Sequence, residues 1–94
     1  MIYTLFIDPL PLSFTSADLS SLVRPFGRVI SARVVCDSLG QSLQFGYVKM
    51  ETAEAADEVY RNLNGTVLDG EKLTVLRLED IEMHDDESTL TGPT

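Results

Sequence analysis

Residues 3–78 alternate between the hydrophobic periods of strands and helices, and the order of these periods leaves few possible folds. The segment 3–8 has the period of two that predicts a strand with one buried face. The period then becomes helical, because four apolar residues fall at i, i+3, i+4 and i+7: Leu19, Leu22, Val23 and Phe26. Thr15 and Asp18 have capping-box spacing and predict where this helix begins.

The second half of the chain predicts two strands, a helix and a final strand. Residues 28–35 and 43–50 are rich in β-branched and aromatic residues, with a loop between them. Thr52 is a candidate cap for a second helix, whose inner face has four members: Ala56, Val59, Tyr60 and Leu63. After a turn at Asp69-Gly70, residues 72–78 predict a fourth strand. The expected order is therefore β-α-β-β-α-β.

Two amphipathic helices in this order can cover only one face of a four-stranded antiparallel sheet, which leaves the other face open. Residues of one strand parity are aliphatic or small and are expected in the core: Leu5, Ile7, Gly46 and Val48. The other parity places Phe6, Phe45 and Tyr47 on the open face, with Arg33 and Lys49 beside them. A register slipped by one residue would bury the rings and expose the aliphatic set instead.

The acidic residues are unevenly distributed along the chain, whose net charge is −8. Residues 1–78 carry nine acidic and seven basic side chains, whereas residues 79–94 carry six acidic side chains and no basic one. We therefore expect a nearly neutral folded domain in residues 1–78 and an acidic tail, without regular structure, in residues 79–94. The tail is expected to aid solubility, or else to lie over Arg33 and Lys49 and compete with a ligand.

Two segments carry a resemblance to the RNA recognition motif (RRM) family. Residues 5–10, LFIDPL, resemble the hexameric RNP motif of that family, with Phe6 in the stacking position. Residues 43–50, LQFGYVKM, resemble its octameric RNP motif, with Phe45 and Tyr47 in the two stacking positions. The resemblance covers residues 2–78 and implies a ferredoxin-like α+β fold that binds single-stranded RNA on its open face.

Four positions depart from the pattern of the family. Leu43 and Gln44 replace a basic residue and a glycine at the start of the octamer, which removes a cation that would pair with a phosphate. Pro9 replaces an asparagine of the hexamer, and Met50 replaces an aromatic residue at an inward position. These changes weaken the electrostatic part of RNA binding and leave the stacking rings in place.

The resulting prediction is a single-stranded RNA-binding module of weak to moderate affinity. The predicted site residues are Phe6, Phe45, Tyr47, Lys49, Arg33, Thr4, Thr74 and Leu43. Single-stranded DNA is an alternative ligand. A second reading is an RRM that binds a partner peptide with the same rings, Leu43 and Leu76. A third is an architectural domain whose face is covered by its tail or by a second copy.

Other features of the sequence place weaker limits on the function. The only histidine, His84, lies in the acidic tail, and no residue pattern predicts a nucleophile with its base, a metal site or a cofactor. We therefore expect a protein that is not an enzyme. We also expect a monomer, and no membrane binding, because no stretch approaches the ~20 apolar residues that span a bilayer. The single Cys36 and the absence of a signal-peptide pattern predict a cytoplasmic location, or a nuclear one in a eukaryote.

Overall fold

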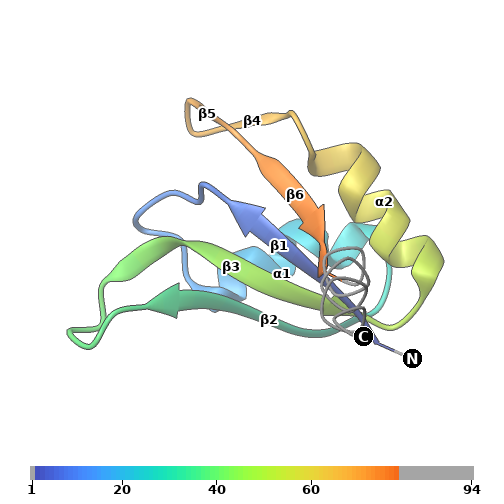
Figure 1. Ribbon diagram of the computed structural model, residues 1–94, viewed down its shortest axis with the longest axis horizontal. Coiled ribbons are helices and arrows are strands. Elements are labelled where there is room, and N and C mark those ends of the chain that lie inside the picture. Colours follow the sequence, from blue (N-terminus) through green and yellow to red (C-terminus); the bar gives the residue numbers. More distant parts are fainter. Residues whose placement is uncertain (1, 79–94) are drawn as a thin grey trace, which may run out of the picture.

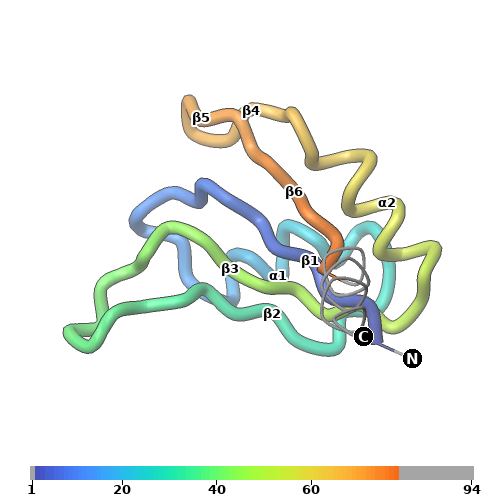
Figure 2. The backbone as a smooth tube through the Cα atoms, viewed as in Figure 1, coloured from blue at the N-terminus to red at the C-terminus, as the bar shows by residue number. Residues whose placement is uncertain are grey.

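The computed structural model describes residues 2–78 and shows the predicted order of elements (Figures 1 and 2). Its main elements are β1 (Tyr3–Asp8), α1 (Ser16–Val23), β2 (Val29–Cys36), β3 (Ser42–Met50), α2 (Ala53–Leu63) and β6 (Thr74–Arg77). A 3-10 turn, η1 (Arg24–Phe26), ends α1, and a hairpin of β4 (Val67–Leu68) and β5 (Glu71–Lys72) precedes β6. The predicted acidic tail, His84 included, lies outside the described residues.

The four long strands form one antiparallel sheet in the order β2-β3-β1-β6. Helix α1 packs against β2 and β3, and α2 packs against β1 and β6, so both helices cover the same face (Figure 1). Between them lies a core that includes Leu5, Ile7, Val48 and Met50, all fully buried. The ferredoxin-like fold with one open sheet face is therefore confirmed. No helix within residues 2–78 is long and apolar enough to cross a membrane.

Both helices begin at the threonines that the sequence indicates. The hydroxyl of Thr15 accepts a hydrogen bond from the backbone N–H of Asp18 at 3.1 Å, and the Asp18 carboxylate accepts one from the Thr15 N–H at 2.9 Å. Thr52 accepts in the same way from the Ala55 N–H at 3.1 Å. These bonds satisfy N–H groups that a helix start otherwise leaves without a partner.

The capping box of α1 provides a stability test. Thr15→Ala should lower the free energy of unfolding by about 1 kcal/mol, because it leaves the N–H of Asp18 without its side-chain acceptor. Thr15→Ser keeps the hydroxyl and should stay within about 0.5 kcal/mol of the parent chain. Urea unfolding of the three proteins measures both values, and an unchanged midpoint for Thr15→Ala would show that the cap contributes nothing.

The end of the domain differs from the prediction of one strand over residues 72–78. The strand is interrupted at Leu73, which is buried, so that β5 pairs with β4 and β6 pairs with β1. The predicted turn at Asp69-Gly70 closes the hairpin, and both residues have the positive φ, 54° and 85°, that a tight hairpin turn requires. The sheet therefore keeps four strands, and the hairpin forms a separate ribbon beside it (Figure 2).

A bulge in β2 changes which of its residues face the helices. Val29 pairs with Met50 and Ser31 pairs with Lys49, so Ile30 is an extra residue between the two pairs. Simple alternation would place Ile30 on the inner face, but 46% of its surface is exposed. After the bulge, Ser31 pairs with Lys49 and Arg33 with Tyr47, the register that the open face requires.

Candidate functional site

The open face of the sheet brings side chains from all four strands into two rows. Across the first row, Arg33 pairs with Tyr47, Tyr47 with Phe6, and Phe6 with Leu76. In the second row, Ser31 pairs with Lys49 and Lys49 with Thr4. With the exception of Leu43, the predicted site residues of β1, β2 and β3 therefore lie on this face, because their strand neighbours of the opposite parity fill the core.

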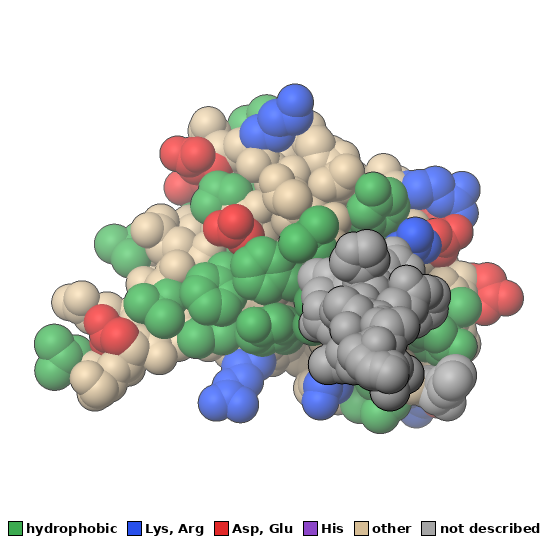
Figure 3. Space-filling model, in the orientation of Figure 1, with side chains coloured by type: hydrophobic (Ala, Val, Ile, Leu, Met, Phe, Trp, Pro, Cys, Tyr) green, Lys and Arg blue, Asp and Glu red, His purple; other side chains and the backbone are tan. Residues whose placement is uncertain are grey.

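The three rings on this face contact one another. The ring centroids are 5.3 Å apart for Phe6 and Phe45, 5.6 Å for Phe6 and Tyr47, and 6.1 Å for Phe45 and Tyr47. Their planes are tilted by 44° to 88°, which is the range of favourable aromatic pairs. Phe6 and Phe45 are half-buried, whereas Tyr47 is 36% exposed. The rings thus form a continuous apolar surface over β1 and β3, which Figure 3 shows as a green band.

Two cations and two hydroxyls from β1, β2 and β3 border this ring cluster. A hollow of about 490 Å³ is lined by six residues: Thr4, Ser31, Ala32, Arg33, Tyr47 and Lys49. Arg33 and Lys49 are exposed, and within residues 2–78 neither forms an ion pair. The hollow combines one aromatic edge with free donors for an anion, and its volume lies in the range of small-ligand sites.

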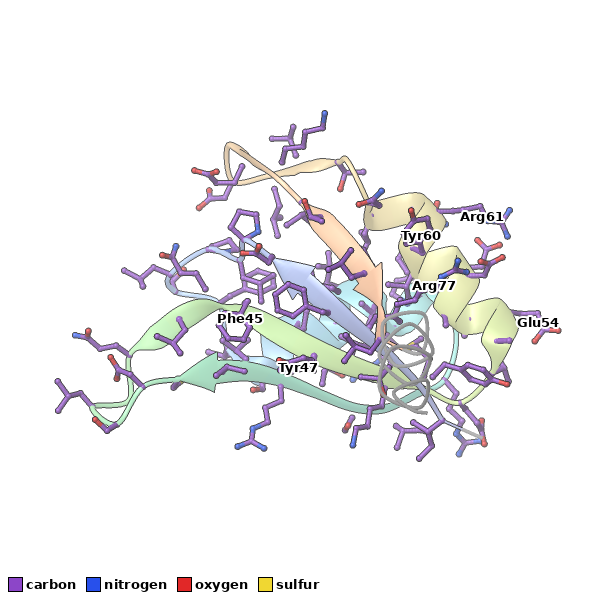
Figure 4. The ribbon with its side chains drawn as sticks, viewed as in Figure 1. Phe45, Tyr47, Glu54, Tyr60, Arg61 and Arg77 are labelled. Atoms are coloured by element: carbon purple, nitrogen blue, oxygen red, sulfur yellow. The ribbon has the colours of Figure 1, made fainter. Side chains whose placement is uncertain are left out.

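Arg61 and Arg77 form ion pairs away from the open face. On the helix side, Arg77 contacts the Asp57 carboxylate at 3.2 Å and lies 5.1 Å from the centroid of the Tyr60 ring. Arg61 binds the carboxylates of Asp57 and Glu58. Figure 4 shows Arg61, Tyr60 and Arg77 together at α2, and Phe45 and Tyr47 along β3. Arg33 and Lys49, the two basic residues that strand parity predicts on the open face, therefore take no part in this group of ion pairs at α2.

The start of β3 departs from simple alternation. Gln44 has a left-handed backbone, with φ of 66°, at the position where the family pattern has a glycine. Its carbonyl accepts a hydrogen bond from the Leu10 N–H at 2.7 Å, and its side-chain amide donates to the Leu10 carbonyl at 3.3 Å. Leu43 is 47% exposed. The left-handed backbone of Gln44, between Leu43 and Phe45, interrupts the strand alternation, so alternation does not place Leu43 on the same face as the rings. Its place in the site stays a prediction.

One acidic residue that the sequence-based site omits lies on the same face. Asp8 has the parity of Phe6 and pairs with Thr74 across β1 and β6, which places this predicted hydroxyl beside a carboxylate. Strand parity alone predicts that Asp8 lies on the open face. Its negative charge, however, is not an expected part of a site for an anionic ligand. Within residues 2–78 no group of three or more His, Cys, Asp or Glu side chains is arranged to hold a metal ion.

These observations define a class: a β-α-β-β-α-β domain that presents contacting aromatic rings on an otherwise open sheet. Residues 5–74 match the family described as RNA recognition motif, and the chain belongs to that family. The resemblance of the two RNP-like segments is therefore confirmed.

Relatives of known sequence carry the same domain within longer chains. The chain is 43% identical over 61 residues to RNA-binding motif, single-stranded-interacting protein 1 from Rattus norvegicus. The match covers 65% of this chain and 15% of the relative. The corresponding mouse protein gives the same identity and coverage. The chain thus spans about 15% of the length of these curated relatives.

Solved structures show the same fold. RNA Binding Protein PG1 superposes with a TM-score of 0.76 at 32% identity, and the match covers 80% of this chain and 92% of that one. The structure named as the Sxl-lethal protein/RNA complex superposes with a TM-score of 0.74 at 24% identity, over 78% of this chain and 44% of that one. The second likeness shows the fold alone.

Proposed function

We propose that this domain binds single-stranded RNA across its open sheet face. The observation that carries the proposal is the cluster of Phe6, Phe45 and Tyr47, whose centroids lie within 6.1 Å of one another beside two cations that form no ion pair within residues 2–78. Unpaired bases stack on such rings, and the family membership and the names of the relatives support RNA as the ligand.

The residues divide into stacking, charged and hydrogen-bonding groups. Phe6 and Tyr47 stack one base each, and Phe45 packs against a ribose between them. Arg33 and Lys49 bind phosphates, while the hydroxyls of Thr4 and Thr74 bind base or sugar edges. Leu43 extends the apolar surface at the start of β3.

The magnitudes predict a modest affinity. Stacking contributes about 1–3 kcal/mol per base, whereas a micromolar complex requires about 8 kcal/mol. Two stacked bases therefore need help from hydrogen bonds and phosphate contacts. With two cations on the face, the logarithm of the affinity should fall with the logarithm of the salt concentration with a slope of about −1.4.

An NMR titration of the isotope-labelled full chain with a degenerate pool of short RNAs tests the proposal. Resonance shifts should cluster at five residues: Phe6, Arg33, Phe45, Tyr47 and Lys49. A matched pool of single-stranded DNA measures the preference for ribose. If no shift appears on the open face at low ionic strength, the RNA-binding proposal fails.

A partner peptide is the second candidate for the same face. Leu76 is 42% exposed and pairs with Phe6, so the ring cluster continues into an aliphatic surface on β6. Exposed apolar patches of this kind often bind protein. Retention of all three rings favours RNA, and the titration separates the two candidates.

The acidic tail predicted from the sequence suggests a regulatory effect on this site. Residues 79–94 carry six acidic side chains and no basic one. We expect removal of residues 79–94 to tighten RNA binding at least about threefold at low ionic strength, because the tail competes with phosphate for Arg33 and Lys49. Fluorescence anisotropy with one short RNA measures both chains, and the difference should vanish at about 0.5 M salt.

A full-length variant separates charge from bulk in this prediction. Its six tail carboxylates are replaced by amides, at Glu79, Asp80, Glu82, Asp85, Asp86 and Glu87. If charge causes the competition, this variant should bind like the shortened chain. Equal affinity of the parent and the shortened chain at low ionic strength would refute the effect of the tail.

A further inference from the structure

Asp8 is a carboxylate on the open face that has no partner in the described part of the chain. It follows Phe6 at the same parity and pairs with Thr74 across β1 and β6. Ile7 pairs with Gly46, so the next residues of β1 and β3 are Asp8 and Phe45. Asp8 is half-buried, and its carboxylate makes no hydrogen bond or ion pair within residues 2–78. A partly desolvated acceptor therefore borders the ring cluster.

The charges of the open face are separated across the sheet. Arg33 lies on β2 and Lys49 on β3, whereas Asp8 lies on β1 beside β6. Neighbouring strands are about 4.8 Å apart, so roughly 10 Å separates Arg33 on β2 from β1. Lys49, on the adjacent strand β3, pairs with Thr4, four residues before Asp8, so about 13 Å along the strand separates it from Asp8. Figure 3 shows the same separation, with basic side chains on the β2 side of the green band and an acidic one on its β6 side. A phosphate is attracted to the first side and repelled from the second.

This arrangement decides which part of a bound nucleotide faces Asp8. If the backbone follows the cations near β2, the bases stacked on the rings extend toward β1 and β6. An ionised carboxylate only accepts hydrogen bonds, so it requires a base edge that donates. Guanine offers two adjacent donors, N1–H and the N2 amino group, which match the two carboxylate oxygens. Uracil offers one N–H between two carbonyl oxygens, which the carboxylate repels.

We propose that Asp8 is a specificity residue that selects guanine, and rejects uracil, for the base stacked beside it. This inference rests on the proposed RNA-binding function. The hydroxyl of Thr74, on the strand position opposite Asp8, donates to the O6 carbonyl of the same guanine. Cytosine and adenine each present one amino group to the carboxylate and rank between guanine and uracil.

The test compares pentanucleotides that differ at one base. Fluorescence anisotropy with labelled UUGUU, UUIUU and UUUUU, where I is inosine, measures the three affinities of the full chain. UUGUU should bind at least about fivefold more tightly than UUUUU. Inosine lacks the N2 amino group and should lose at least about half of that preference.

Asp8→Asn supplies the protein side of the test. The amide both donates and accepts, so the variant should bind UUUUU more tightly and reduce the preference for guanine below about twofold. Glu54→Gln removes one negative charge at α2, away from the rings in Figure 4, and should keep the preference of the parent chain. The control thus separates a local contact from the change in net charge.

The outcomes separate the two proposals. If none of the pentanucleotides binds, the RNA-binding function fails and the base preference fails with it. If they bind with equal affinity to the parent chain, RNA binding stands and the assignment of Asp8 is wrong. Equal binding of guanine and inosine overturns the two-donor contact without any variant, even if Asp8→Asn does not fold.

Discussion

Replacing Phe6 and Tyr47 together by alanine should weaken RNA binding by at least about thirtyfold. Each ring stacks one base in the proposed complex, and stacking contributes about 1–3 kcal/mol per base. The rings also contact each other, with centroids 5.6 Å apart, so the single substitutions should not add up to the effect of the double one. Anisotropy titrations of the two single variants and the double variant measure both effects.

Leucine at the same two positions is the matched control. Phe6→Leu with Tyr47→Leu keeps much of the apolar area but removes the π-faces. If stacking holds the RNA, this variant should bind nearly as weakly as the alanine pair. If it binds like the parent chain, the rings act as a general apolar surface, which favours a peptide ligand. Phe6 is half-buried, so its replacement could unfold the domain. Thermal unfolding of each variant verifies that the domain is still folded.

Gly46→Ala should destabilise the domain by about 2–3 kcal/mol. A Cβ atom at Gly46 would lie 2.6 Å from the backbone carbonyl oxygen of Arg33 and 2.8 Å from a Leu19 methyl group. The carbonyl belongs to the paired strand β2, so β2 and β3 must separate or α1 must move away. For a domain of this size, the midpoint of thermal unfolding should fall by roughly 10 °C or more.

Gly40→Ala distinguishes close packing from backbone strain. Gly40 has φ of 83°, and apart from Gly40 and its two chain neighbours, no residue in the described part of the chain lies within 4 Å of the position that its Cβ would occupy. Its substitution should therefore cost only the strain of a left-handed residue, about 1 kcal/mol. If Gly46→Ala costs no more than Gly40→Ala, the close approach of β2 and α1 to Gly46 does not limit stability.

The order of elements was predictable because each one has a strong local signal. The rings were placed correctly because Leu5, Ile7 and Val48 form an aliphatic set of opposite parity, and burial of that set fixes the register. The helix starts were predictable because Thr15 and Thr52 carry the hydroxyl that the exposed N–H groups need. Local chemistry and global packing agree at these positions.

The missed features depend on pairing between distant segments. Nothing near Ile30 marks a bulge, which follows from the alignment of β2 with β3. Gln44 adopts its left-handed backbone while bonded to Leu10, which lies 34 positions earlier in the chain. The division of the last predicted strand likewise follows from the two different partners of β5 and β6. A single segment contains too little information about such partners.

Because Phe6, Phe45 and Tyr47 pack against one another, the motion of their side chains is restricted on folding, before any ligand binds. Each ring is already held by two others, and their contacts form during folding rather than during binding. Immobilising a free side chain at an interface costs about 0.5–1.5 kcal/mol, and a ligand of this face is spared most of that cost for three side chains. Most of the conformational entropy lost on association is therefore that of the flexible ligand. The affinity of this domain then depends on how rigid its ligand is before it binds.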